Sequence, residues 1–183
     1  MMLEDLKNSE YVVLDLETTW LTPYREWITE IAAIKCKDWR IIDEFQTLIN
    51  PERHIPNWIV KLTWITNEMV ADAPTIGKVM PNFSEFLWND IIVGHNVNFD
   101  FRFLNYYHYQ IMWTYLENQT ICTLKIARRL LPWLPNRKLW TICEYFGITN
   151  ERAHRAMWDT RATLQVLQKY EAILNTAENH WNF

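Results

Sequence analysis

The chain has 183 residues, the length of about one domain, and 49% of them are hydrophobic and 22% charged. This composition excludes a disordered or fibrous protein, and the formal charge of −4 lacks the basic surplus typical of nucleic-acid binders. No apolar run approaches the roughly 18 residues of a membrane span, and the opening MMLEDLKNSE is too acidic for a signal peptide. We therefore expect one cytoplasmic domain over residues 1–183, with its core at about 10–175 and no membrane partner.

The first part of the chain has the pattern of a three-stranded meander. Segments 11–15, 28–36 and 40–49 are rich in apolar and β-branched residues, and the turn-like residues 37–39 join the last two. The first segment reads as a strand buried on both faces. We expect the three strands to pair in antiparallel fashion.

The rest of the chain alternates helices with one further strand. Segment 91–95, IIVGH, reads as a short buried strand. Helical spacing predicts helices over 67–74, 77–89, 98–110, 123–132, 138–148 and from about 155 to 174. Strands first and alternation afterwards predict an α/β fold, a mixed central sheet flanked by helices. The residues after 175 are expected to fray.

An acidic pair, Asp15 and Glu17, lies in the stretch VVLDLETTW. Side chains alternate along a strand, so both carboxylates project to the same side, roughly 7 Å apart. Like charges on a buried face repel and are costly to desolvate, which favours a cation between them. Mg²⁺ and Mn²⁺ prefer such oxygen ligands. The alternative is a solvated strand end with two ordinary acids, because D-x-E is a short pattern.

A third acid, Asp100, follows the predicted strand at 91–95 in the stretch GHNVNFD. It falls early in the next helix, beside the carboxyl end of a strand, where α/β folds place ligands. Asn98 is expected to cap that helix. The alternative for Asp100 is a first-turn acid that the helix dipole stabilises.

The last predicted helix carries an acid on its buried face. Asp159 begins an apolar stripe at helical spacing, which continues through Thr163, Val166, Tyr170 and Leu174. His154 lies five residues earlier, 140° away around an ideal helix, so we place it in the preceding loop, facing the same site. A lone histidine is ordinarily structural, but a buried acid beside it favours a functional pair.

Three motifs carry a resemblance that covers nearly the whole chain. LDLETT, HNVNFD and HRAMWD, in this order and separation, resemble the motifs of the DnaQ-like, or DEDDh, 3′-5′ exonucleases. This family includes the epsilon subunit of DNA polymerase III and the exonuclease domain of PolC-type polymerases. KLTWITNEM and CTLKIARRLLPWLP are also similar to its members, especially the PolC-like branch.

The resemblance implies an RNase H-like fold and a metal-dependent hydrolase. It would remove nucleoside 5′-monophosphates from a 3′ end, with DNA favoured over RNA and proofreading as a role. The implied partners are a single-stranded DNA 3′ end and a replicative DNA polymerase. The alternatives are an exoribonuclease of the same superfamily and a non-catalytic module that binds nucleic acid or a polymerase.

The site residues are carried over by matching the motifs. The matches to the metal-binding acids are Asp15, Glu17, Asp100 and Asp159, and the match to the general base is His154. The resemblance implies two cations, Mg²⁺ or Mn²⁺. One would be held by Asp15, Glu17 and Asp159, and the other by Asp15 with Asp100. Four carboxylates and two divalent cations sum to zero charge, which would let an acidic protein accept a phosphate backbone.

Contacts to the substrate are expected from two sets of residues. Thr18, Asn96 and Phe99 are candidates for the terminal nucleotides, by hydrogen bonding or stacking, with core packing as the alternative for Phe99. The basic residues that could face phosphates are Lys125, Arg128, Arg129, Arg137 and Lys138. A solvated helix face is the alternative for this basic set.

Tryptophan occurs where this family usually has glycine. The chain has 3 glycines and 11 tryptophans, together 14 of 183 residues, or about 7.7%, close to the ~7% that glycine usually contributes alone. Tryptophan replaces glycine at Trp20, Trp64, Trp133 and Trp140, and glycine would be unsurprising at Trp39 and Trp158. We hypothesise that UGA codons, written as tryptophan, are read as glycine by the source organism. The rival is a tryptophan-rich divergent member, in which Trp20 crowds the site.

Overall fold

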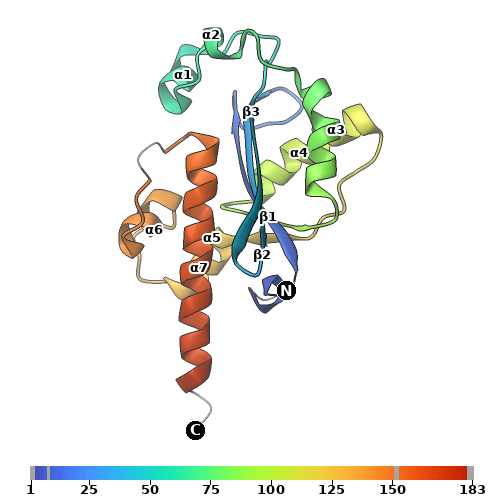
Figure 1. The fold of residues 1–183 in the computed structure, drawn as a ribbon. Helices are drawn as coiled ribbons and strands as arrows, with labels where there is room; N and C mark the ends of the chain where they lie inside the picture. The colour runs from blue at the N-terminus through green and yellow to red at the C-terminus, as the bar shows by residue number, and fades with distance from the viewer. Residues whose placement is uncertain (1–2, 8, 151–152, 181–183) are drawn as a thin grey trace.

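A five-stranded sheet forms the centre of the protein, with helices on both of its faces (Figure 1). The computed structural model describes residues 3–7, 9–150 and 153–180. The strands are β1 Glu10–Thr18, β2 Ile28–Lys37, β3 Arg40–Leu48, β4 Ile91–Gly94 and β5 Thr120–Cys122. The helices are η1 Leu3–Leu6, α1 Asn57–Thr63, α2 Asn67–Val70, α3 Ile76–Leu87, α4 Asn98–Met112, α5 Thr123–Leu130, α6 Leu139–Phe146 and α7 Ala156–His180. Within this described part, none of the helices is long and apolar enough to span a membrane.

The strand order is β3-β2-β1-β4-β5, which places β1 in the middle of the sheet. Strand β1 pairs antiparallel with β2 and parallel with β4, and β2 pairs antiparallel with β3. The predicted α/β fold with a mixed sheet, and the meander at its start, are therefore confirmed. The central position also explains why the apolar residues of β1 are buried on both faces.

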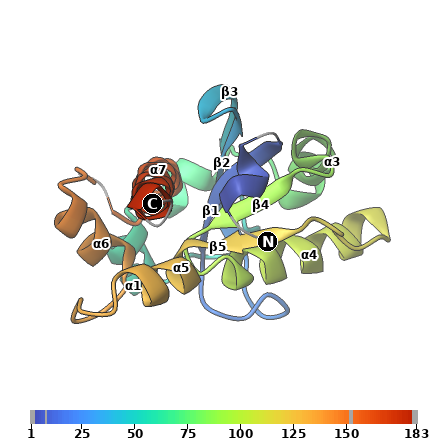
Figure 2. The same cartoon turned by 90° about the horizontal axis from the view of Figure 1, so that it is seen from below.

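The alternation of side chains along β1 divides the core into two layers. Val13 packs in a cluster that includes residues of α5, α6 and α7. Val12 and Leu14 pack in the other cluster, which includes residues of α3 and α4. Figure 2 shows the two groups of helices on opposite sides of the sheet. Asp15 and Glu17 share the parity of Val13, so the strand directs them toward the α7 side.

The structure corrects several of the expected boundaries. Helix α2 is a single turn rather than a helix over 67–74, and α7 runs beyond 174 to His180, so most of the segment expected to fray is helical. The expected fraying of 181–183 falls outside the described residues. Helix α1 and strand β5 were not predicted, because a seven-residue and a three-residue element leave too little periodicity. The expected cap at Asn98 is wrong, because the residue preceding α4 is Val97.

Tryptophans occupy backbone conformations that normally require glycine. Four of those in the described residues have positive φ: Trp39 at 63°, Trp64 at 60°, Trp88 at 43° and Trp113 at 60°. The last three follow α1, α3 and α4 directly, the position at which Gly147, with φ 65°, follows α6. Positive φ is uncommon outside glycine and is an outlier for a bulky residue.

These angles favour the glycine hypothesis at some positions and leave it open at others. They support it at Trp39 and Trp64, and they extend it to Trp88 and Trp113, which the comparison with family motifs did not single out. The backbone is neutral about the remaining candidates, whose φ is not positive: Trp20, Trp133, Trp140 and Trp158. Codon reassignment itself stays a prediction.

Candidate active site

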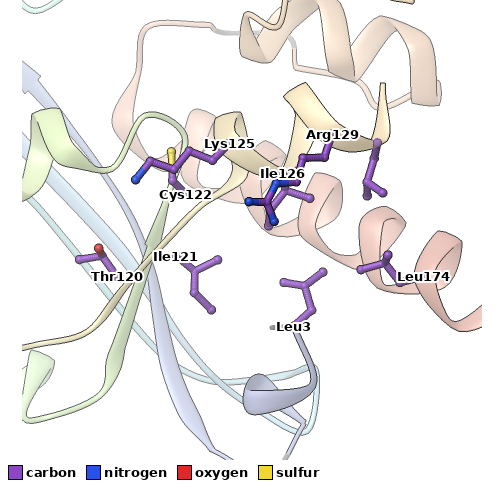
Figure 3. Close-up of a pocket in the computed structure, with 9 residues that line it drawn as sticks. Leu3, Thr120, Ile121, Cys122, Lys125, Ile126, Arg129 and Leu174 are labelled. Atoms are coloured by element: carbon purple, nitrogen blue, oxygen red, sulfur yellow. The ribbon is translucent and has the colours of Figure 1, made fainter. Parts of the chain in front are cut away.

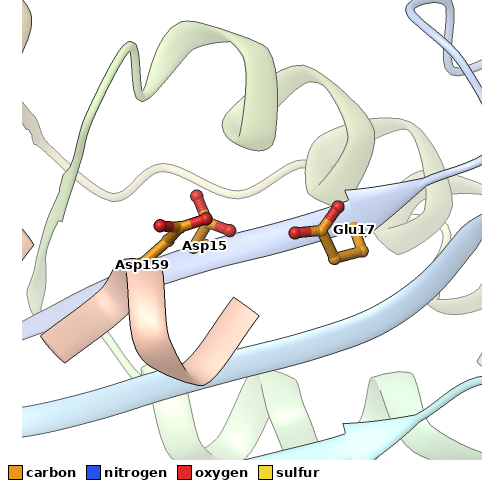
Figure 4. Close-up of side chains that lie close together, drawn as sticks. All are labelled: Asp15, Glu17 and Asp159. Atoms are coloured by element: carbon orange, nitrogen blue, oxygen red, sulfur yellow. The ribbon is translucent and has the colours of Figure 1, made fainter. Parts of the chain in front are cut away.

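Three carboxylates from two distant segments meet beside the central strand. Asp15 and Glu17 come from β1, and Asp159 comes from the first turn of α7. One carboxylate oxygen from each of the three residues lies within 4.8 Å of the other two oxygens. Figure 4 shows the Asp15 and Asp159 carboxylates together, with Glu17 further along the same strand. Oxygen ligands this close suit a hard divalent cation, so the residues present fit the expected metal.

Burial and mutual repulsion oppose ionisation of these acids. Burial, followed by the charges of Asp100, Asp159 and Glu17, raises the pKa of Asp15 well above its usual value. Burial also raises the pKa of Glu17, with further contributions from Asp159 and Glu30. A cation bound between the carboxylates would relieve both effects.

Asp100 lies beside this group at the start of α4. It is buried, and its Oδ1 accepts a hydrogen bond from the Leu16 backbone N–H at 3.1 Å. Burial raises the pKa of Asp100 to about 7, and the hydrogen bond from Leu16 opposes the rise. Since the charge of Asp100 also raises the pKa of Asp15, the two carboxylates are electrostatic neighbours. Its part in a second metal site stays a prediction.

The loop before α7 holds Asp159 from two sides. The His154 backbone N–H donates to Asp159 Oδ2 at 2.8 Å, and Asn150 Nδ2 donates to Asp159 Oδ1 at 2.6 Å. Helix α7 begins at Ala156, so the prediction that His154 lies in the preceding loop is confirmed. His154 is exposed and lines a cleft of about 770 Å³ together with Asp15 and Asp159. The imidazole can therefore reach solvent within the same cleft as the acids.

The three candidate substrate contacts have different surroundings. Asn96 is exposed and lines the cleft. Thr18 is buried, and its hydroxyl donates to the Trp20 carbonyl at 2.7 Å. Phe99 packs against Phe103 with ring centroids 5.1 Å apart and belongs to the core layer of α3 and α4. The packing of Phe99 favours its structural alternative, while Asn96 has the open position that a nucleotide contact needs.

The basic residues divide into two separate sets. Arg128, Arg137 and Lys138 line the cleft with the acids. Lys125 and Arg129 instead line a cavity of about 330 Å³ between β5, α5 and α7 (Figure 3). Consecutive residues of a helix are 100° apart around its axis, so α5 directs Arg128 and Arg129 toward different surfaces. The single basic patch expected from the sequence is therefore two sets, of which only one adjoins the acids.

Two charged residues beside the site were not singled out in the sequence. Glu30 is fully buried in β2, opposite Glu17, and it is paired with Arg155 from the loop before α7. One signal was available, since Glu30 is the only charged residue in the mostly apolar run ITEIAAI. Local pattern could not identify its partner, which is 125 positions away.

Comparison with known proteins provides independent findings. A family model described as Exonuclease (RNase_T) matches residues 12–167. The chain is 40% identical to "DNA polymerase III PolC-type" of Bacillus subtilis (strain 168) over 165 residues, which are 90% of this chain but 12% of that protein. It is 38% identical to "DNA polymerase III subunit epsilon" of Aquifex aeolicus (strain VF5) over 168 residues, 92% of this chain and 83% of that protein. The chain thus spans about an eighth of the PolC-type relative.

Solved structures agree with the fold. "Exonuclease X in complex with 5′ overhanging duplex DNA" superposes with a TM-score of 0.70 at 27% identity, covering 92% of this chain and 93% of that one. E. coli Exonuclease I in complex with a dT13 oligonucleotide superposes with a TM-score of 0.81, covering 94% and 43% of the two chains. At 19% identity, the second likeness concerns the fold alone. The predicted RNase H-like fold is confirmed by these exonuclease neighbours.

Proposed function

This chain belongs to the exonuclease family, and we propose that it is a metal-dependent 3′-5′ exonuclease that shortens DNA one nucleotide at a time. The observation that carries the proposal is the convergence of carboxylate oxygens of Asp15, Glu17 and Asp159 within 4.8 Å of one another. Asp15 and Asp159 also line a cleft together with His154. DNA is favoured because the relatives named above are a DNA polymerase and a DNA polymerase subunit, and one structural neighbour is bound to DNA. A replicative DNA polymerase is the proposed partner on the same basis.

Each side chain has a distinct role in the proposed reaction. Asp15, Glu17 and Asp159 would hold one divalent cation, and Asp100 would support a second beside Asp15, with Mg²⁺ or Mn²⁺ as the ions. Such cations, when bound, activate a water and offset negative charge at the phosphate and the leaving oxygen. His154 accepts the proton of the attacking water as the new P–O bond forms. The bond to the 3′ oxygen breaks, and a nucleoside 5′-monophosphate leaves.

A degradation assay tests this function directly. We expect Mg²⁺-dependent release of labelled mononucleotide from a 3′-labelled single-stranded DNA, no release with EDTA, and none from an oligomer blocked at its 3′ end. Preferential degradation of a matched RNA oligomer would support the exoribonuclease alternative. Retention of intact DNA without any release would support a binding module instead.

The division of the basic residues predicts where the substrate backbone lies. Arg128 and Lys138 are exposed and line the cleft, so Arg128→Ala with Lys138→Ala is expected to raise the KM for the oligomer about tenfold, with kcat within about twofold. The slope of log(1/KM) against log salt concentration should become shallower by about 1.4, the value for two lost contacts to a single strand. Steady-state kinetics at several salt concentrations measure both.

A charge-matched control is available on the same helix. Lys125→Ala with Arg129→Ala also removes two exposed cations, but from the cavity beside β5. We expect this variant to keep the KM and the salt slope of the parent protein. Equal effects of the two double variants would show that net charge, rather than the cleft, determines binding.

A further inference from the structure

We infer that the ion pair between the buried Glu30 and the partly buried Arg155 positions Asp159 and His154 for the reaction, an inference that rests on the proposed function. Glu30 is fully buried, and both of its carboxylate oxygens accept hydrogen bonds. Arg155 Nε donates to Oε2 at 3.1 Å and Arg155 Nη2 donates to Oε1 at 3.0 Å. The Ala156 N–H and Gln46 Nε2 each add a bond of 3.0 Å. With its oxygens used in this way, Glu30 serves as an anchor rather than as a metal ligand.

The two residues bonded to Glu30 in this region, Arg155 and Ala156, lie where the loop that carries His154 joins α7. Arg155 follows His154 directly, and Ala156 is the first residue of α7. The Ala156 N–H belongs to the first turn of the helix, where a carboxylate is a favourable acceptor. The Asp159 backbone N–H donates to the Arg155 carbonyl at 3.1 Å, and the His154 N–H donates to the Asp159 carboxylate. A continuous set of contacts therefore runs from β2 through Arg155 to the proposed metal ligand and the proposed base.

The pair also balances charge next to the acids. Glu30 lies opposite Glu17 in the register of β1 and β2. The charge of Glu30 is one of the influences that raise the pKa of Glu17, and the charge of Arg155 opposes them. Loss of Arg155 would leave the buried charge of Glu30 unpaired, and loss of Glu30 would leave the partly buried charge of Arg155 unpaired, whereas loss of both leaves neither charge. Stability and positioning can therefore be separated by experiment.

The test compares single and double variants of the pair. Glu30→Gln and Arg155→Met are each expected to lower the melting temperature and kcat, because each leaves one charge unpaired. In the double variant Glu30→Gln with Arg155→Met, we expect the melting temperature to recover, while kcat stays at least tenfold below the parent and the KM for DNA changes less than threefold. Arg155→Lys keeps the charge without the two-pronged contact, so an intermediate kcat is expected.

A second ion pair, made by a residue of α7 itself, provides the matched control. Arg161 Nη2 contacts Glu44 Oε1 and Oε2 at 2.9 and 2.8 Å, and it joins α7 to β3 on the exposed surface. Glu44→Gln with Arg161→Met should leave kcat and the melting temperature close to those of the parent. Calorimetric titration with Mn²⁺ adds a readout that does not depend on turnover. We expect at least fivefold weaker binding in the Glu30/Arg155 double variant and parental binding in the control.

The outcomes distinguish this inference from the proposed function. An inactive parent protein would contradict the exonuclease proposal itself. An active parent whose Glu30/Arg155 double variant matches it in kcat and Mn²⁺ affinity would overturn the positioning role and leave the function intact. If the double variant does not fold, Arg155→Lys decides, and a parental kcat in that variant would overturn the inference.

Discussion

Asp15→Asn is expected to abolish nucleotide release and, at the same time, to stabilise the metal-free protein. Asparagine keeps the shape of the side chain but loses the charge of a central ligand, so the rate should fall at least 1,000-fold, about 4 kcal/mol in the barrier. Without metal, the same change removes a charge that burial and neighbouring acids disfavour. A gain of roughly 1–2 kcal/mol in unfolding free energy would raise the melting temperature by about 2–8 °C. Rates with Mg²⁺ and melting curves in EDTA measure the two effects.

The direction of the pKa shifts predicts how the stability of the metal-free protein depends on pH. Asp15, Glu17, Asp100 and Asp159 all have raised pKa values, with Asp100 at about 7, so the folded protein retains protons that the unfolded chain releases at about pH 4. This stabilisation is complete at pH values below the pKa values of the unfolded chain. It is lost as pH rises through the pKa values of the folded protein. The metal-free protein should therefore melt at a lower temperature at pH 8 than at pH 6, and Asp15→Asn should reduce the difference.

An exposed acid far from the cluster provides the control. Asp72 lies outside the cleft and is exposed, so Asp72→Asn should change neither the rate nor the metal-free melting temperature. Retained activity in Asp15→Asn would contradict the proposed ligand role. A lower metal-free stability in that variant would instead show that Asp15 makes a favourable contact as a carboxylate.

Replacing three tryptophans by glycine is expected to stabilise the fold. Trp64, Trp88 and Trp113 are 70%, 70% and 77% exposed, so little packing is lost with the indoles. Their positive φ is unfavourable for any residue with a β-carbon by roughly 1–2 kcal/mol. The largest single gain is expected at Trp88, whose φ of 43° and ψ of −136° lie outside the regions allowed for ordinary residues. After allowance for the flexibility of unfolded glycine, the triple variant should gain about 3 kcal/mol, measured by chemical denaturation.

The control for this prediction is a tryptophan within a helix. Trp58 lies in α1, is 47% exposed and lacks positive φ, so Trp58→Gly should destabilise the protein by about 1 kcal/mol. The codon hypothesis has a separate test in the gene and in the mass of the protein from its own cells. UGA codons at positions 64, 88 and 113 are expected, and UGG codons there would contradict it. Destabilisation by the triple variant would show that the indoles contribute contacts that outweigh the backbone strain.

The sequence by itself determined much of the site, because local periodicity decides which side chains share a face. The period of two along β1 placed Asp15 and Glu17 on one side of the strand, and the stripe on the last helix placed Asp159 toward the body of the protein. The resemblance of the motifs then identified the family, which the comparisons confirm. The same pattern could not show how closely the three acids approach, because their separation depends on how α7 packs across the sheet.

Tertiary structure alone decided the features that depend on contacts between distant segments. Glu30 and Arg155 are 125 positions apart, and their pairing follows from the packing of the loop before α7 on β2. The basic residues divided because the two faces of α5 border different cavities. The strained tryptophans at 88 and 113 could be located only once the ends of α3 and α4 were known. Local pattern specifies the direction of a side chain within its own element, whereas its neighbours are set by the packing of elements against one another.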